Sequence, residues 1–128
     1  MANSQSFTRT RQLALALTMA AAAVYGAPAQ AHARLAASTP AAGAVLASAP
    51  ASLRLQFSEV LEAAFSTLSL RDGRGAELAI GKPALDPHDQ KVLTASLPRL
   101  ASGSYQVRWS AASHDGHRTR GTFSFDVK

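Results

Sequence analysis

The chain has 128 residues, and its 13 Lys and Arg against 8 Asp and Glu give a formal net charge of +5. It contains no cysteine, which excludes disulfides, thiolate metal ligands and thiol catalysis. The basic residues are scattered along the sequence and form no run, which argues against a nucleic-acid partner.

The first 31 residues have the order of regions that is typical of a secretory signal peptide. Arg9 and Arg11 come first, the apolar stretch Leu13–Val24 follows, and small residues stand at Ala29 and Ala31. The alternative is a membrane-spanning helix, but the apolar stretch is about 12 residues long, whereas a span needs roughly 20. We therefore predict an exported protein with a cleaved signal.

The expected cleavage point lies after Ala31. Thr10 separates the two arginines of the signal, which favours the general secretory route over the twin-arginine route. Ala27 and Ala29 offer other cleavage points that the sequence leaves open. Cleavage after Ala31 leaves residues 32–128 as one small domain, with eleven basic residues against eight acidic ones and a formal charge of +3.

Cleavage at this point would make His32 the first residue of the mature chain. Its free α-amine and its imidazole could then close on one metal ion. Both methionines, Met1 and Met19, lie in the predicted signal, so the mature domain has no sulfur ligand at all. Any metal that it binds must accept nitrogen and oxygen.

The mature segment has the alternation of apolar and polar residues that is typical of β-strands with one buried face. Asp72-Gly73 predicts a hairpin turn within it. About seven strands are expected, at Leu35, 53–57, 67–71, 77–80, 92–97, 105–110 and 122–127. This pattern predicts an all-β fold, an antiparallel sandwich or Greek-key barrel.

Two segments between these strands are interpreted as connecting loops. Ala41–Ala51 is rich in alanine and is flanked or broken by proline and glycine. Lys82–Lys91 contains Pro83 and the pair Asp86-Pro87.

The segment after the 105–110 strand holds a second group of possible metal ligands. In Ser113-His114-Asp115-Gly116-His117, Asp115 and His117 are two residues apart, so in an extended backbone their side chains would share one side of the sheet. His114 would then point the other way. A solvated turn would use the same residues, and the spacing alone does not establish that Asp115 and His117 meet His32.

Several motifs, in a common order, resemble the CopC family of periplasmic copper-resistance proteins over nearly all of residues 32–128. They are His32 at the cleavage point, Ser38-Thr39-Pro40-Ala41, Leu53-Arg54-Leu55-Gln56-Phe57-Ser58-Glu59, Gly103-Ser104-Tyr105-Gln106-Val107-Arg108-Trp109, Asp115-Gly116-His117 and Gly121-Thr122-Phe123-Ser124-Phe125. Each motif alone is weak, and their combination is specific.

The resemblance implies a seven-stranded Greek-key β-barrel, cupredoxin-like or immunoglobulin-like, that holds one Cu(II) per chain. By the same resemblance, His32 gives its amine and imidazole, His117 an imidazole and Asp115 a carboxylate oxygen. Glu59 would lie near the copper as an outer hydrogen-bonding group, the alternative being a surface acid that ends a strand. Cu(II) favours such nitrogen and oxygen ligands and stands highest in the Irving–Williams order. Because the amine and imidazoles must lose protons to bind, affinity should fall on acidification.

The family also includes members with a methionine-rich loop for Cu(I), and the sequence has no methionine after Met19. We therefore expect no Cu(I) methionine site. The resemblance further implies an inner-membrane copper transporter of the CopD type as a partner, and we expect a monomer. His88 matches no family position and is interpreted as a solvated loop residue. Trp109 is interpreted as a core residue or a wall near the site.

Two other functions remain open on the sequence. One is an immunoglobulin-like exported binding module in which His32 has no role. The other is a copper oxygenase that uses His32 as a histidine brace, although about 97 residues leave little surface for a substrate and Asp115 would fill a position that such chemistry needs open. We expect a carrier and no enzyme.

Overall fold

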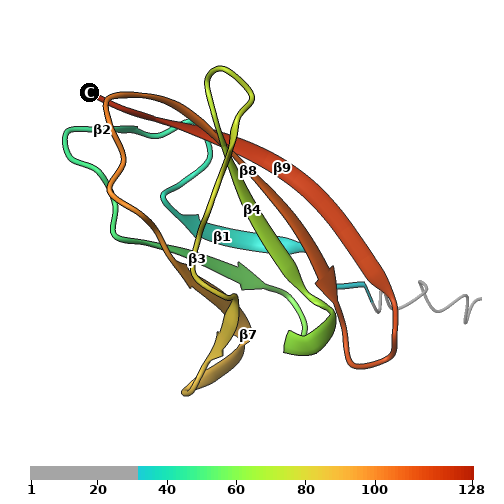
Figure 1. The fold of residues 1–128 in the computed structure, drawn as a ribbon. Coiled ribbons are helices and arrows are strands. Elements are labelled where there is room, and N and C mark those ends of the chain that lie inside the picture. Colours follow the sequence, from blue (N-terminus) through green and yellow to red (C-terminus); the bar gives the residue numbers. More distant parts are fainter. Residues whose placement is uncertain (1–31) are drawn as a thin grey trace, which may run out of the picture.

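The protein is described by a computed structural model that covers residues 32–128, so the predicted signal peptide and its cleavage site lie outside the described residues. This part of the chain folds into strands with a single 3-10 turn (Figure 1). The elements are β1 (Leu35–Thr39), β2 (Val45–Leu46), β3 (Ser52–Phe57), η1 (Ala63–Phe65), β4 (Thr67–Asp72), β5 (Glu77–Leu78), β6 (Ala84–Asp86), β7 (Asp89–Ser96), β8 (Gly103–Ala112) and β9 (Arg118–Val127).

The strands form two sheets, which confirms the predicted all-β fold. One sheet has the order β1-β3-β7-β6 and the other the order β2-β9-β8-β4-β5. The longest pairing is the β8–β9 hairpin, whose register runs from Gly103 opposite Val127 to Ala112 opposite Arg118. Figure 1 shows the start of the described chain at the same end of the molecule as the turn between β8 and β9, with the C-terminus at the other end.

The core lies between the two sheets, and every second residue of a long strand points into it. Leu53, Leu55 and Phe57 of β3 are at most 1% exposed, while the residues between them are exposed, as the two-residue period predicts. The Phe57 ring meets the edge of Trp109 from the facing sheet, with ring centroids 5.2 Å apart. In a domain without cysteine, contacts of this kind hold the two layers together.

Two short strands lie in segments that the sequence predicted to be loops. β2 lies in Ala41–Ala51 and β6 in Lys82–Lys91, so residues 32–128 contain nine strands where about seven were expected. β2 also runs parallel to β9, which corrects the expectation of a purely antiparallel fold. Strands of two or three residues are too short to show a period, and only pairing with a neighbour defines them.

The Asp72-Gly73 hairpin is confirmed. Asp72 Oδ1 accepts hydrogen bonds from the backbone N–H groups of Arg74 and Ala76, both at 2.9 Å. Gly75 has a φ of 82°, which glycine adopts without steric cost.

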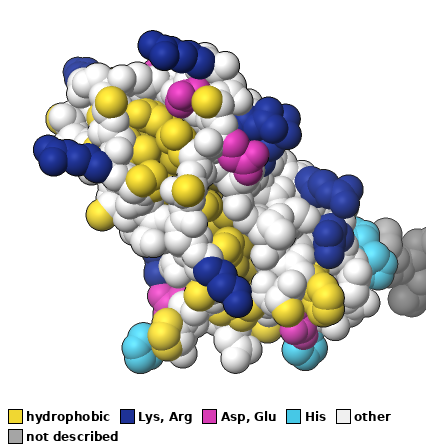
Figure 2. Space-filling view, in the orientation of Figure 1, with side chains coloured by type: hydrophobic (Ala, Val, Ile, Leu, Met, Phe, Trp, Pro, Cys, Tyr) yellow, Lys and Arg dark blue, Asp and Glu magenta, His cyan; other side chains and the backbone are white. Residues whose placement is uncertain are grey.

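Charged side chains are dispersed over the surface. Figure 2 shows Lys and Arg side chains at separate positions on the visible face, with acidic groups between some of them. None of the helical structure in residues 32–128 is long and apolar enough to cross a membrane.

Candidate metal centre

The segment that begins with His32 is held between the two sheets by hydrogen bonds just behind it. Ala33 is fully buried, and its carbonyl oxygen accepts a 2.6 Å hydrogen bond from the Thr119 hydroxyl of β9. Arg34 N donates to Ser58 Oγ at 2.9 Å, and Ser58 N donates back to the Arg34 carbonyl at 2.9 Å. His32 itself is exposed. The buried, hydrogen-bonded residues behind it therefore act as an anchor that leaves the His32 side chain accessible.

Replacing Thr119 by valine should loosen this anchor while keeping the side-chain shape. The Ala33 carbonyl would lose its hydroxyl donor, and we expect a stability loss of about 1 kcal/mol, the usual net value of one hydrogen bond. Urea unfolding measures the loss, and hydrogen exchange at Arg34 locates it. The matched control is Thr122→Val on the exposed face of the same strand, which should leave both unchanged. Equal effects of the two substitutions would contradict the anchoring role.

The turn between β8 and β9 brings Asp115 to His117. His117 N donates to Asp115 Oδ1 at 3.0 Å, and His117 Nδ1 lies 3.0 Å from Asp115 Oδ2. The turn is closed by Gly116 N, which donates to the Ser113 carbonyl at 3.0 Å, and Gly116 has a φ of 87°. Of the two backbone conformations that the sequence left open, the structure has the turn, so Asp115 reaches His117 through a turn and not through strand alternation.

The same contacts set the charge of Asp115. The Ser113 hydroxyl donates to Oδ1, and Ser113 is only 3% exposed, which fixes that donor in place. This hydrogen bond, then the His117 N–H and the His117 side chain, hold the pKa of Asp115 well below its usual range. Asp115 is therefore a carboxylate at any pH at which the histidines are neutral.

His32 and His117 meet although 84 residues separate them in the chain. Their ring centroids are 4.6 Å apart and the rings are nearly perpendicular. The three residues predicted as ligands are thus linked, His32 to His117 and His117 to Asp115. Across residues 32–128, however, no three His, Asp or Glu side chains stand in a ready-made metal-binding group. Exposed side chains would have to turn toward an ion, and a terminal amine would add a donor that is not a side chain.

Comparisons with known proteins identify the family of this chain. The family model described as "CopC domain" matches residues 35–128, a range that contains Asp115 and His117 and begins after His32. The chain belongs to the CopC family. It is 40% identical over 116 residues to "Copper resistance protein C" of Pseudomonas syringae pv. tomato, covering 85% of this chain and 90% of that protein. It is 36% identical over 99 residues to "Protein YobA" of Escherichia coli K12, covering 77% and 80%.

A solved CopC structure has the same fold. The crystal structure of CopC from Methylosinus trichosporium OB3b superposes with a TM-score of 0.72 at 31% identity, covering 76% of this chain and 94% of that one.

Other side chains of this CopC domain lie apart from the three predicted ligands. His114 Nδ1 lies 2.6 Å from Glu62 Oε1, so it pairs with the segment before η1. Glu59 is partly buried, and none of the hydrogen bonds or ion pairs found in residues 32–128 involves it. His88 is exposed in the turn between β6 and β7.

Sequence reasoning missed the residues that position the predicted ligands. Ser58 and Thr119 hold the segment behind His32, and Ser113 holds Asp115. For Ser58 a signal existed, because it lies inside the Phe57-Ser58-Glu59 motif of the CopC resemblance, in which Glu59 was the predicted functional residue. Ser113 and Thr119 carry no such signal, since serine and threonine are common in the strands and turns of any sheet.

Proposed function

We propose that this CopC domain is a periplasmic Cu(II)-binding protein that sequesters or transfers copper in copper resistance or homeostasis. The family and the copper-resistance relatives support a copper-related role. The observation that carries the proposal is the meeting of His32 and His117, with ring centroids 4.6 Å apart, beside a carboxylate already in contact with His117.

The proposed ligands are the amine and imidazole of His32, the imidazole of His117 and a carboxylate oxygen of Asp115. Nδ1 of His117 faces Asp115, which leaves Nε2 for the metal. Each carboxylate oxygen has two lone pairs, and Oδ2 of Asp115 has only the His117 contact, so it keeps one for copper. A carboxylate bonded to a ligating imidazole also fixes the ring and raises its basicity. We propose Glu59 as an outer group that hydrogen-bonds a ligand or bound water.

The ligand chemistry favours one Cu(II) ion and no Cu(I). Amine, imidazole and carboxylate suit tetragonal Cu(II), whereas Cu(I) prefers thiolate and thioether sulfur. The sequence has no cysteine, and both of its methionines lie in residues 1–31. Reduction on the protein would therefore leave copper in a poor ligand set.

The remaining parts of the proposal concern the route and the partners. Export by the general secretory route, with cleavage after Ala31, gives a 32–128 domain that carries the terminal amine. A monomeric carrier would exchange copper with an inner-membrane transporter of the CopD type. Binding and release require no chemical step, so we propose no enzymatic activity. The basic residues are scattered and form no run, so we propose no nucleic-acid partner.

A Cu(II) titration of the exported protein tests the function. We expect one copper per chain, seen by calorimetry and by a nitrogen-coordinated electron paramagnetic resonance signal. His117→Ala should weaken binding by more than the roughly 10 to 100-fold that loss of an outer partner costs. The matched control is His88→Ala, which removes an exposed histidine from a turn and should leave the titration unchanged. Equal losses in both variants would contradict the assignment of His117 as a ligand. The absence of stoichiometric binding would favour an exported binding module without a metal site.

A further inference from the structure

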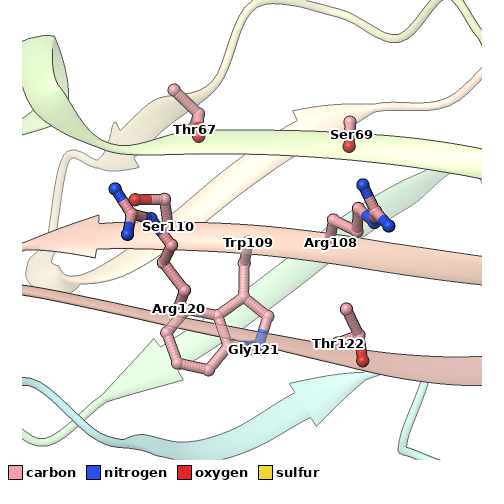
Figure 3. Close-up of a pocket in the computed structure, with 8 residues that line it drawn as sticks. All are labelled: Thr67, Ser69, Arg108, Trp109, Ser110, Arg120, Gly121 and Thr122. Atoms are coloured by element: carbon pink, nitrogen blue, oxygen red, sulfur yellow. The ribbon is translucent and has the colours of Figure 1, made fainter.

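A groove lies on the outer face of the five-stranded sheet, formed by other residues than the proposed copper ligands. It has a volume of about 480 Å³ and crosses β4, β8 and β9 (Figure 3). Its polar lining consists of two arginines and four hydroxyl residues, Arg108, Arg120, Thr67, Ser69, Ser110 and Thr122. The copper proposal uses none of these side chains.

The strand register arranges the six residues in two rows. Ser69 of β4 stands opposite Arg108, and Arg108 stands opposite Thr122 of β9. In the next row, Thr67 stands opposite Ser110, and Ser110 opposite Arg120. Each row therefore contains one guanidinium and two hydroxyls on the same face of the sheet.

The groove carries positive charge without a compensating acid. No Asp or Glu lines it, and none of the ion pairs found in residues 32–128 involves Arg108 or Arg120. Figure 3 shows the two guanidinium groups apart from each other, that of Arg120 beside Ser110 and that of Arg108 farther along β8. Two separated cationic groups on one face suit a ligand with two anionic groups.

One hydroxyl of the groove is buried without a hydrogen-bond partner. Ser110 is 9% exposed, and its Oγ makes no hydrogen bond within residues 32–128. A buried polar group left unsatisfied is costly, so such groups are rare in folded proteins. The same Oγ has almost no accessible surface, so a ligand oxygen would reach it and provide the missing partner once the Arg120 side chain beside it (Figure 3) turned toward the ligand.

We propose that this groove binds a small soluble ligand carrying phosphate groups, with Arg108 and Arg120 each holding one group. Guanidinium forks match phosphate oxygens in charge and geometry, and the Ser and Thr hydroxyls can donate to the remaining oxygens. The volume lies within the range of small-molecule sites. The groove is also lined by Trp109, but its ring packs against Phe57 in the core and does not project as an apolar anchor for a bilayer, which favours a soluble ligand over a lipid surface.

Titration of the metal-free protein with pyrophosphate at constant ionic strength tests this proposal. We expect saturable binding by calorimetry that weakens at least about tenfold in the double variant R108Q/R120Q, since charged hydrogen bonds to two groups are lost. The matched control R74Q/R99Q removes two exposed arginines outside the groove and should bind as the unchanged protein does.

Ser110→Ala separates ligand binding from folding. Because the hydroxyl has no partner in the protein, we expect an unchanged or higher unfolding midpoint together with weaker pyrophosphate binding. Equal losses in both arginine pairs would overturn the proposal, as would binding to anionic phosphatidylglycerol vesicles without saturable pyrophosphate binding. Copper is absent from these measurements, so their outcome is independent of the copper proposal.

Discussion

One extra residue in front of His32 should lower the Cu(II) affinity of the mature protein by about 100-fold or more. The extension converts the α-amine into an amide and removes one of two donors that act together on the same ion. A second donor held on the same molecule binds at high effective concentration, which is worth about 10² to 10⁴ in affinity. A 100-fold loss corresponds to about 2.7 kcal/mol of binding free energy. Competition with a chelator of known Cu(II) affinity measures it.

The control for this experiment is one extra residue after Lys128, which leaves the amine free. Lys128 lies at the end of the molecule opposite to the β8–β9 turn (Figure 1), so this variant should bind copper normally. The mass of the exported protein comes first and should correspond to a chain that begins at His32. A different first residue, or an extension without effect, would refute the terminal chelate while leaving a site based on His117 open to its own test.

The Phe57→Ala substitution should be the most damaging single change to the fold among those considered. Phe57 is 1% exposed, is paired with Leu35 of β1, and contacts Trp109 across the two sheets. Removing a buried phenylalanine ring costs about 3 to 5 kcal/mol, because apolar contacts are lost and a cavity remains. Small domains have a total stability of only about 5 to 15 kcal/mol. Urea unfolding followed by Trp109 fluorescence reports the loss.

The matched control is Phe65→Ala, the same substitution at a residue that is 60% exposed on η1. It should change stability by less than about 0.5 kcal/mol. If Phe57→Ala does not fold, Phe57→Leu keeps part of the volume and should give a smaller, measurable loss. A Phe57→Leu midpoint equal to that of Phe65→Ala would contradict the role of Phe57 as a contact between the sheets.

The sequence predicted the two-sheet fold because long strands with one buried face carry their period in the residues themselves. β3 shows this best, since its alternation matches its burial at every position. The edge strands β2 and β6 were missed because two or three residues carry no period, whereas the equally short β5 was predicted from the Asp72-Gly73 turn signal before it. β2 is defined only by its pairing with β9, as the hydrogen bond from Lys128 N to the Leu46 carbonyl at 2.9 Å illustrates.

The sequence predicted which residues are candidate ligands but not how the fold brings them together. The sequence left open whether Asp115 and His117 share one strand face or lie in a turn, and in the structure a turn closed by Gly116 and Ser113 brings them together. Ser58 and Thr119 anchor the segment behind His32 through backbone bonds that depend on strands distant in the chain.

The sequence by itself determined the all-β class and the absence of sulfur ligands from residues 32–128, because composition and short periods are local properties. The expected cleavage point, the Asp115-Gly116-His117 spacing and the family resemblance made His32, Asp115 and His117 candidates. Only the tertiary structure decided that His32 lies beside His117 and that Arg108 and Arg120 share one groove with an unpartnered Ser110. These contacts depend on strand register and on the packing of two sheets, which are set by the summed burial of many side chains and are not written in any one segment.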